Sequence, residues 1–73
     1  MTQEQKVLNY MEIKGTITAL EAMKMGILRL SARIYDLKRS GHRIGMRRER
    51  VRNTDGTYST IAVYFIVQKM EEL

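Results

Sequence analysis

Apolar side chains recur at helical spacing near the start of the chain, and capping residues mark the ends of the predicted helix. Thr2 followed by Gln5 forms a capping-box pattern, and Gly15 is the type of residue that ends a helix in a left-handed turn. The pattern therefore predicts a supporting helix from Thr2 to Lys14. The residues on its apolar side are Val7, Leu8, Tyr10 and Met11.

A short β-branched stretch follows and leads into a second helix. Thr16 and Ile17 favour a brief strand, and Thr18 is then placed to cap a helix from Ala19 to about Met25. Glu21 stands three residues after Thr18 and completes a second capping box. The residues of this helix that are expected to face inward are Leu20 and Met23.

Gly26 is the predicted pivot between the second helix and a third one that runs from about Arg29 to Ser40 and ends at Gly41. Counted from Thr18, Ala22 is fifth and Gly26 ninth, where a helix-turn-helix needs a small residue and a left-handed one. The alternative is an ordinary helical hairpin with a glycine cap. The apolar positions expected to pack on the first two helices are Ile27, Leu30, Ile34 and Leu37.

After Gly41 the period changes to two, which predicts strands from His42 to Val51 and from Tyr58 to Val67. The segment NTDGT between them favours a tight turn, so the two strands form a hairpin. Both faces of the second strand are largely apolar; one should cover the helices, and the other should meet a partner or the C-terminal tail. Gln68 to Leu73 is expected to be frayed or a final partial turn.

Length and residue types restrict the class of protein. Seventy-three residues without cysteine predict one domain, residues 1–73, with a small core and neither a disulfide nor a thiolate metal site. No signal peptide or membrane-spanning run is visible, which favours a cytoplasmic protein. His42 is the single histidine, no carboxylate pair or nucleophile–base couple is apparent, and no phosphate-binding glycine loop occurs. We therefore expect that the protein is not an enzyme and binds neither a metal ion nor a cofactor.

Basic residues concentrate between residues 29 and 52, which hold nine of the thirteen lysines and arginines but only two of the eight acids. Most of these bases are arginine, whose planar guanidinium binds phosphates and guanine edges in a forked geometry. On the third helix the face opposite the apolar stripe carries bases and small residues; the alternative is a solvated face in which Asp36 pairs with Arg33 or Arg39. This face comprises Arg29, Ala32, Arg33, Asp36 and Arg39, flanked by Ser31 and Tyr35.

In the first strand of the hairpin, Arg48, Arg50 and Arg52 fall on one face, and Arg47 falls on the other with Glu49. A basic hairpin directly after such a helix is a wing, which lies along the DNA backbone or in the minor groove. The element order predicts an α+β winged helix-turn-helix, with the helix-turn-helix at 18–40 and the wing at 42–67. The candidate nucleic-acid-binding residues are Arg29, Ser31, Arg33, Tyr35, Arg39, Arg43, Arg47, Arg48, Arg50 and Arg52.

The stretch ITALEAMKMGILRLSARIYDLKRSGHRI, with the DGT turn and the AVYF strand, resembles the small winged helix-turn-helix proteins of bacteriophages and prophages. The resemblance covers nearly the whole chain and implies DNA binding in regulation, excision or replication. It implies that Arg29, Ser31, Arg33 and Tyr35 face DNA, with the wing contributing Arg47, Arg48 and Arg50. Leu28 departs from the family pattern, because similar proteins often have threonine or serine there to cap the third helix.

The expected partner is double-stranded DNA, bound by a homodimer or a cooperative array because one module contacts only a short site. The alternative is a phage-encoded inhibitor, for example of a CRISPR nuclease, that binds a host protein through the same basic face. Leu28 and the apolar second face of the hairpin motivate this alternative. Met46 and Met70 are either part of such an adaptable protein-binding surface or ordinary core and surface residues.

Overall fold

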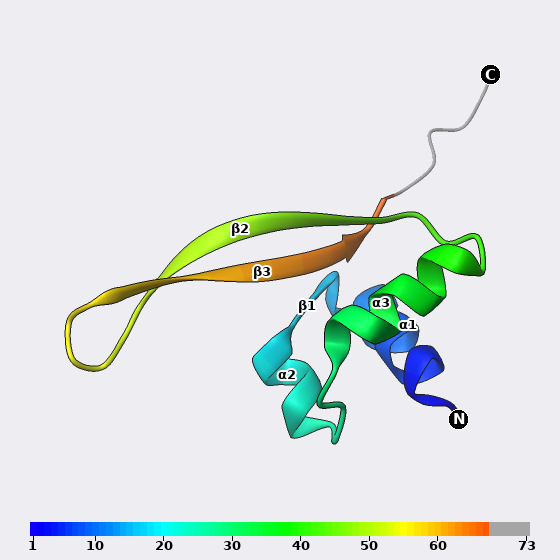
Figure 1. Cartoon of the computed structure of the whole chain (residues 1–73), viewed down its shortest axis with the longest axis horizontal. Helices are drawn as coiled ribbons and strands as arrows, with labels where there is room; N and C mark the ends of the chain where they lie inside the picture. Colours follow the sequence, from blue (N-terminus) through cyan, green and yellow to red (C-terminus); the bar gives the residue numbers. More distant parts are fainter. Residues whose placement is uncertain (68–73) are drawn as a thin grey trace.

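Three helices lie along one face of a three-stranded antiparallel sheet at its base, and the far end of the sheet projects beyond them as a hairpin (Figure 1). The computed structural model describes residues 1–67, so the expectations for Gln68–Leu73 and Met70 lie outside the described residues. This arrangement is the predicted α+β winged helix-turn-helix. In chain order the elements are α1 (Gln3–Lys14), β1 (Thr16–Thr18), α2 (Ala19–Lys24), α3 (Leu30–Arg39), β2 (Ile44–Arg52) and β3 (Tyr58–Ile66).

Capping boxes begin both α1 and α2, as the sequence predicted. The Thr2 hydroxyl accepts the Gln5 N–H while the Gln5 side chain accepts the Thr2 N–H, and Thr18 and Glu21 do the same for α2. Each pair satisfies two backbone donors that a helix start would otherwise leave without partners. The brief strand β1 is confirmed, and Thr18 serves both as its last residue and as the cap of α2.

The turn between α2 and α3 has the conformation that the glycine spacing predicted. Gly26 has a φ of 86°, a region that side chains disfavour, and the Ile27 N–H donates to the Ala22 carbonyl at 2.9 Å. Ala22 is fully buried, so its small side chain allows the close approach that the motif requires. Ile27 is 1% exposed and fixes the turn to the core.

Two expectations for α2 are wrong. Leu20 and Met23 were expected to face inward, but their side chains are 57% and 52% exposed, and Ala22 is the one buried residue of the helix. The helix has only six residues, and the capping box together with the buried Ala22 sets its rotation. Apolar residue type therefore does not decide which side of so short a helix is buried.

The third helix buries the predicted stripe, but it begins one residue later than expected. Leu30, Ile34 and Leu37 are buried against Val7 and Met11 of α1. Arg29, rather than Leu28, occupies the N-cap position, and its side chain makes no capping hydrogen bond. The lack of a side-chain cap is confirmed, but the assignment of the cap position to Leu28 is wrong. The core is completed by Ile17, Ala22, Ile27 and Ile44.

The register of the sheet assigns each face of the hairpin a different role. Ile44 lies opposite Ile66, and Ile17 lies opposite Tyr64, so these residues share the face that packs on the helical core. Beyond the helices the same face is formed by alternate residues of β2 and β3, which include Arg48 opposite Ala62 and Arg50 opposite Thr60. On the other face, Val63 is buried on β3 between Thr18 of β1 and Arg47 of β2. The two strands extend over Ile44–Arg52 and Tyr58–Ile66, within one or two residues of the predicted bounds.

Gly45 leaves the space that the Phe65 ring occupies. A Cβ at position 45 would lie 2.6 Å from Phe65 Cζ, closer than real Cβ atoms come to their neighbours. We expect Gly45→Ala to lower the free energy of unfolding by about 1–3 kcal/mol through this overlap, measured by urea denaturation. The double variant Gly45→Ala/Phe65→Leu should recover part of the loss. Equal losses in the single and double variants would contradict this explanation.

Candidate nucleic-acid interface

The side of α3 that faces away from the core presents polar and basic side chains to solvent. Ser31, Tyr35 and Arg39 are exposed along the helix, and the Arg39 guanidinium lies 5.8 Å from the centroid of the Tyr35 ring. The exposed Arg29 precedes the first turn of the helix. Because the helix start has unpaired N–H groups and no side-chain cap, this end also favours an anion. The surface suits contact with phosphates and base edges.

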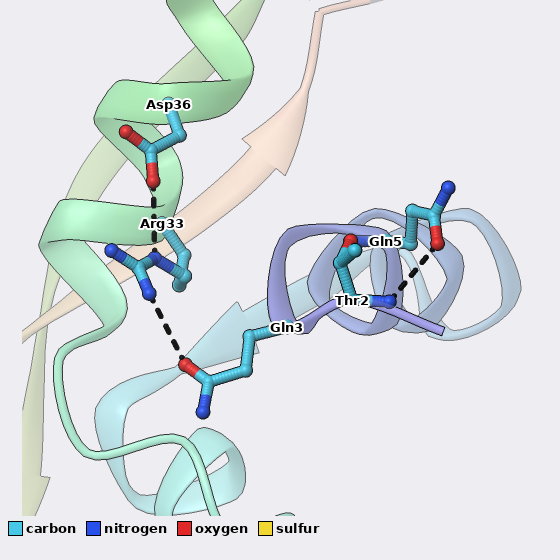
Figure 2. Close-up of polar contacts among 5 residues, drawn as sticks. All are labelled: Thr2, Gln3, Gln5, Arg33 and Asp36. Atoms are coloured by element: carbon cyan, nitrogen blue, oxygen red, sulfur yellow. Dashed lines mark hydrogen bonds and ion pairs between the residues drawn. The ribbon is translucent and has the colours of Figure 1, made fainter.

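Arg33 lies apart from this surface, although it was predicted to belong to it. Its Nη1 donates to Gln3 Oε1 of α1 at 3.2 Å, and its Nε lies 3.2 Å from Asp36 Oδ2 (Figure 2). The Nε atom is shielded from solvent and has no hydrogen bond of good geometry, so its contact with Asp36 is an ion pair. The side chain thus joins α3 to the start of α1. Of the two predicted alternatives for Asp36, the structure shows pairing with Arg33.

Three wing arginines share one face, as the alternation of the strand predicted. Arg48, Arg50 and Arg52 lie opposite Ala62, Thr60 and Tyr58, on the face whose base packs against the helices. All three are exposed, because the hairpin projects past α2 at this point (Figure 1). The Arg50 guanidinium lies 4.5 Å from the centroid of the Tyr58 ring.

Side-chain hydrogen bonds order the turn that joins the wing strands. Asp55 Oδ1 accepts the Thr57 hydroxyl at 2.6 Å and the Thr57 N–H at 3.0 Å, and Asn53 Nδ2 donates to Thr57 Oγ1 and Ser59 Oγ. The hydroxyl of Thr57 and then its N–H hold the pKa of the Asp55 carboxyl below its ordinary value. With Gly56 at a φ of 91°, these bonds set the hairpin register and hence the face on which the arginines lie.

A family profile described as a winged helix-turn-helix domain matches residues 2–69. The chain belongs to the winged helix-turn-helix family. Comparisons with curated proteins and with solved structures return no significant match. In a helix-turn-helix, the second helix enters the major groove, and that helix is α3 here. Membership of the winged helix-turn-helix family therefore supports DNA binding.

The two remaining predicted residues, Arg47 and Arg43, lie outside both the exposed side of α3 and the wing face that carries Arg48, Arg50 and Arg52. Arg47 is on the opposite face of the wing, paired with Glu49 at 2.7 Å and 5.7 Å from the centroid of the Phe65 ring. Its side chain therefore covers part of the outer apolar face of the sheet. Arg43 precedes β2, where its carbonyl accepts the Val67 N–H and its side chain is exposed.

One exposed base on the same side of α3 as Ser31 was absent from the predicted set. Lys38 lies seven residues after Ser31, which places both on the same side of α3. Extending the helical spacing by two turns would have found it.

Within residues 1–67, no group of three or more histidine or acidic side chains is placed to hold a metal ion. None of the helices in that part of the chain is long and apolar enough to cross a membrane.

Proposed function

We propose that this protein is a DNA-binding regulator of phage or prophage origin that acts in the cytoplasm. The observation that carries the proposal is that Arg48, Arg50 and Arg52 lie together on one exposed face of the wing, in a chain whose α3 also presents exposed bases. Both acids of the basic segment, Asp36 and Glu49, are paired with arginines, so the cations around them dominate the local potential.

In this proposal α3 enters the major groove and the wing follows the backbone or minor groove. Arg29 and Arg39 contact guanine edges or phosphates, with Ser31 and Tyr35 between them on the same surface. Arg48, Arg50 and Arg52 bind phosphates, with Arg43 and Arg47 as outer contacts. Because one module covers a short site, we propose a homodimer or a cooperative array on the DNA.

The direct test is fluorescence anisotropy with random and genomic duplexes at several salt concentrations. With five to seven neutralised phosphates, the log–log slope of affinity against salt should be roughly −5. Undetectable binding to mixed-sequence duplex DNA at low salt would reject the proposal. A site preference among the genomic duplexes would support a regulatory role.

Arg33 was predicted to face DNA, but Asp36 pairs with it, so Asp36 should compete with DNA for its guanidinium. We expect Asp36→Asn to raise affinity for duplex DNA about threefold at low salt, because it removes a negative charge and frees the guanidinium. Glu12→Gln removes the same charge from an exposed position on α1 and is the matched control in the anisotropy assay. Equal affinities for the two variants would mean that Arg33 takes no part in binding.

A second candidate is a phage-encoded, protein-directed inhibitor, for example of a CRISPR nuclease. The observation that favours it is Leu28, which is 78% exposed immediately before the cap of α3, where a DNA reader gains more from a polar residue. Pull-down from host lysate treated with nuclease distinguishes the candidates. Partners retained without DNA favour the inhibitor, and their complete loss counts against it.

A further inference from the structure

The central strand β3 has a free edge over half of its length. Strand β2 pairs with β3 from Tyr58 to Ile66, but β1 covers only Val63–Phe65 on the other side. Within residues 1–67 no strand pairs with the outer edge of 58–62. The Asn53 N–H donates to the Thr57 carbonyl, so the alternation of the ladder turns the N–H and C=O groups of Tyr58, Thr60 and Ala62 outward.

This edge lacks the features that normally prevent strand addition. The outer edge belongs to the segment YSTIA, which contains no charge and no proline. The other free edge of the sheet, on β2, carries five charged residues along Ile44–Arg52. Charged side chains are a usual means of protecting an edge strand, and only the β2 edge has them. The 58–62 edge is therefore open to another strand.

An apolar groove of about 640 Å³ lies directly beside this edge. Its walls come from the starts of α2 and α3 and from the wing strands. Leu20 and Leu28 line it while remaining largely exposed, so they gain burial only when the groove is filled. The other apolar side chains that line it include Leu30, Val51, Ile61 and Tyr64.

The charges around the groove select its occupant. Arg29 is the one charged residue that lines it, and strand β2, which contributes Val51 to the lining, also carries Arg48, Arg50 and Arg52. The one acid of this strand, Glu49, is paired with Arg47. An acidic partner would therefore be attracted. A second copy of this chain carries the same net charge of +5 and would bring two basic segments together.

We propose that the groove and the 58–62 edge together bind an extended acidic segment of a partner protein as an added strand. The main chain of the segment pairs with Tyr58, Thr60 and Ala62, and alternate apolar side chains enter the groove. Its carboxylates meet Arg29 and the wing arginines. This site goes beyond the proposed DNA binding, because it uses the edge and apolar wall of the wing and does not depend on a duplex.

The test begins with a displayed library of random twelve-residue peptides selected on the intact protein. We expect the enriched peptides to combine two or three acidic residues with apolar residues at alternate positions. No enrichment over an unrelated immobilised protein, or enrichment of basic peptides, would overturn the proposal. A selected peptide is then synthesised with a fluorescent label, together with a version that has proline at its centre, which should lose binding.

Three substitutions on the protein distinguish the groove from general charge effects. Leu20→Asp and Leu28→Asp should each weaken the peptide at least about tenfold, by repelling its carboxylates and removing apolar contact. Met23→Asp is the matched control, because Met23 lies on the same helix as Leu20 with similar exposure but does not line the groove. Equal effects at positions 20 and 23 would overturn the proposal. Circular dichroism melting establishes that each variant is folded.

Amide hydrogen exchange followed by NMR tests the added strand itself. The Thr60 and Ala62 amides should become protected by at least about tenfold when the peptide is bound, because they gain partners. The Ser59 and Ile61 amides, which already face β2, should change less. Binding without this contrast would overturn the strand-addition geometry. If the Leu20 and Leu28 variants bind duplex DNA more weakly and no peptide is enriched, the groove is part of the DNA-binding surface and the peptide proposal is overturned. If the protein does not bind DNA but does bind a selected peptide, the proposed function fails and the peptide proposal is supported.

Discussion

Replacing Arg48, Arg50 and Arg52 together with glutamine is expected to lower affinity for mixed-sequence duplex DNA on the order of 100-fold at low salt. The three guanidinium groups share one exposed face of the wing, so they can meet one DNA backbone together. Each lost phosphate contact also removes a released counterion. The log–log salt slope should therefore become shallower by about 3.

The matched control replaces Lys6, Lys14 and Lys24 with glutamine. These lysines are exposed on α1 and α2, and their loss changes the net charge by the same amount as the wing variant. If affinity depends on net charge alone, both triple variants will weaken equally, and the wing will have no special role. Anisotropy titrations at a minimum of three salt concentrations give both the affinity and the slope.

Ile27→Ala should have the largest effect on stability, lowering the free energy of unfolding by about 2–5 kcal/mol. Ile27 is almost completely buried directly after Gly26, where it packs α2, α3 and β1 together. Truncation leaves a cavity that this turn cannot close, since the Ile27 N–H is fixed to the Ala22 carbonyl. In a domain of this size, the midpoint of thermal unfolding should fall by roughly 15 °C.

Ile13→Ala is the control for this substitution, because Ile13 lies on α1 with its side chain 70% exposed. The substitution deletes the same side-chain atoms, but from an exposed position, so it should change the free energy of unfolding by less than about 0.5 kcal/mol. Urea denaturation of both variants provides the comparison. Similar losses at the two positions would show that the turn repacks around the smaller residue.

Local signals in the sequence were sufficient for most of the fold. The capping boxes at Thr2 and Thr18 and the glycine at position 26 act within a few residues, so their geometry follows directly from the chain. The period of two after Gly41 fixed the hairpin and the face shared by Arg48, Arg50 and Arg52. These features follow from residue types and spacings within a few positions of one another, so they could be predicted without knowing the tertiary contacts.

The features that sequence reasoning missed depend on contacts between distant residues. Arg33 contacts Gln3, thirty residues earlier, and no helical spacing could indicate that pairing. Leu20 and Met23 looked like core residues, but the core is filled by Ile17, Ala22 and Ile27 without them. The groove beside β3 arises because β1 is only three residues long, and its width depends on how the helices sit against the sheet.

Under the proposed DNA-binding function, the Arg33–Asp36 ion pair has a kinetic consequence for the search of a genome. Asp36 occupies the Arg33 guanidinium as a phosphate would, so in the proposed complex a duplex has to displace it before Arg33 can contribute a contact. The free-energy cost of that displacement is offset only where the full set of contacts forms. A repulsive element of this kind increases discrimination between the correct DNA site and other sites. We therefore expect short dwell times on unrelated DNA and faster scanning, with tight residence reserved for the correct site.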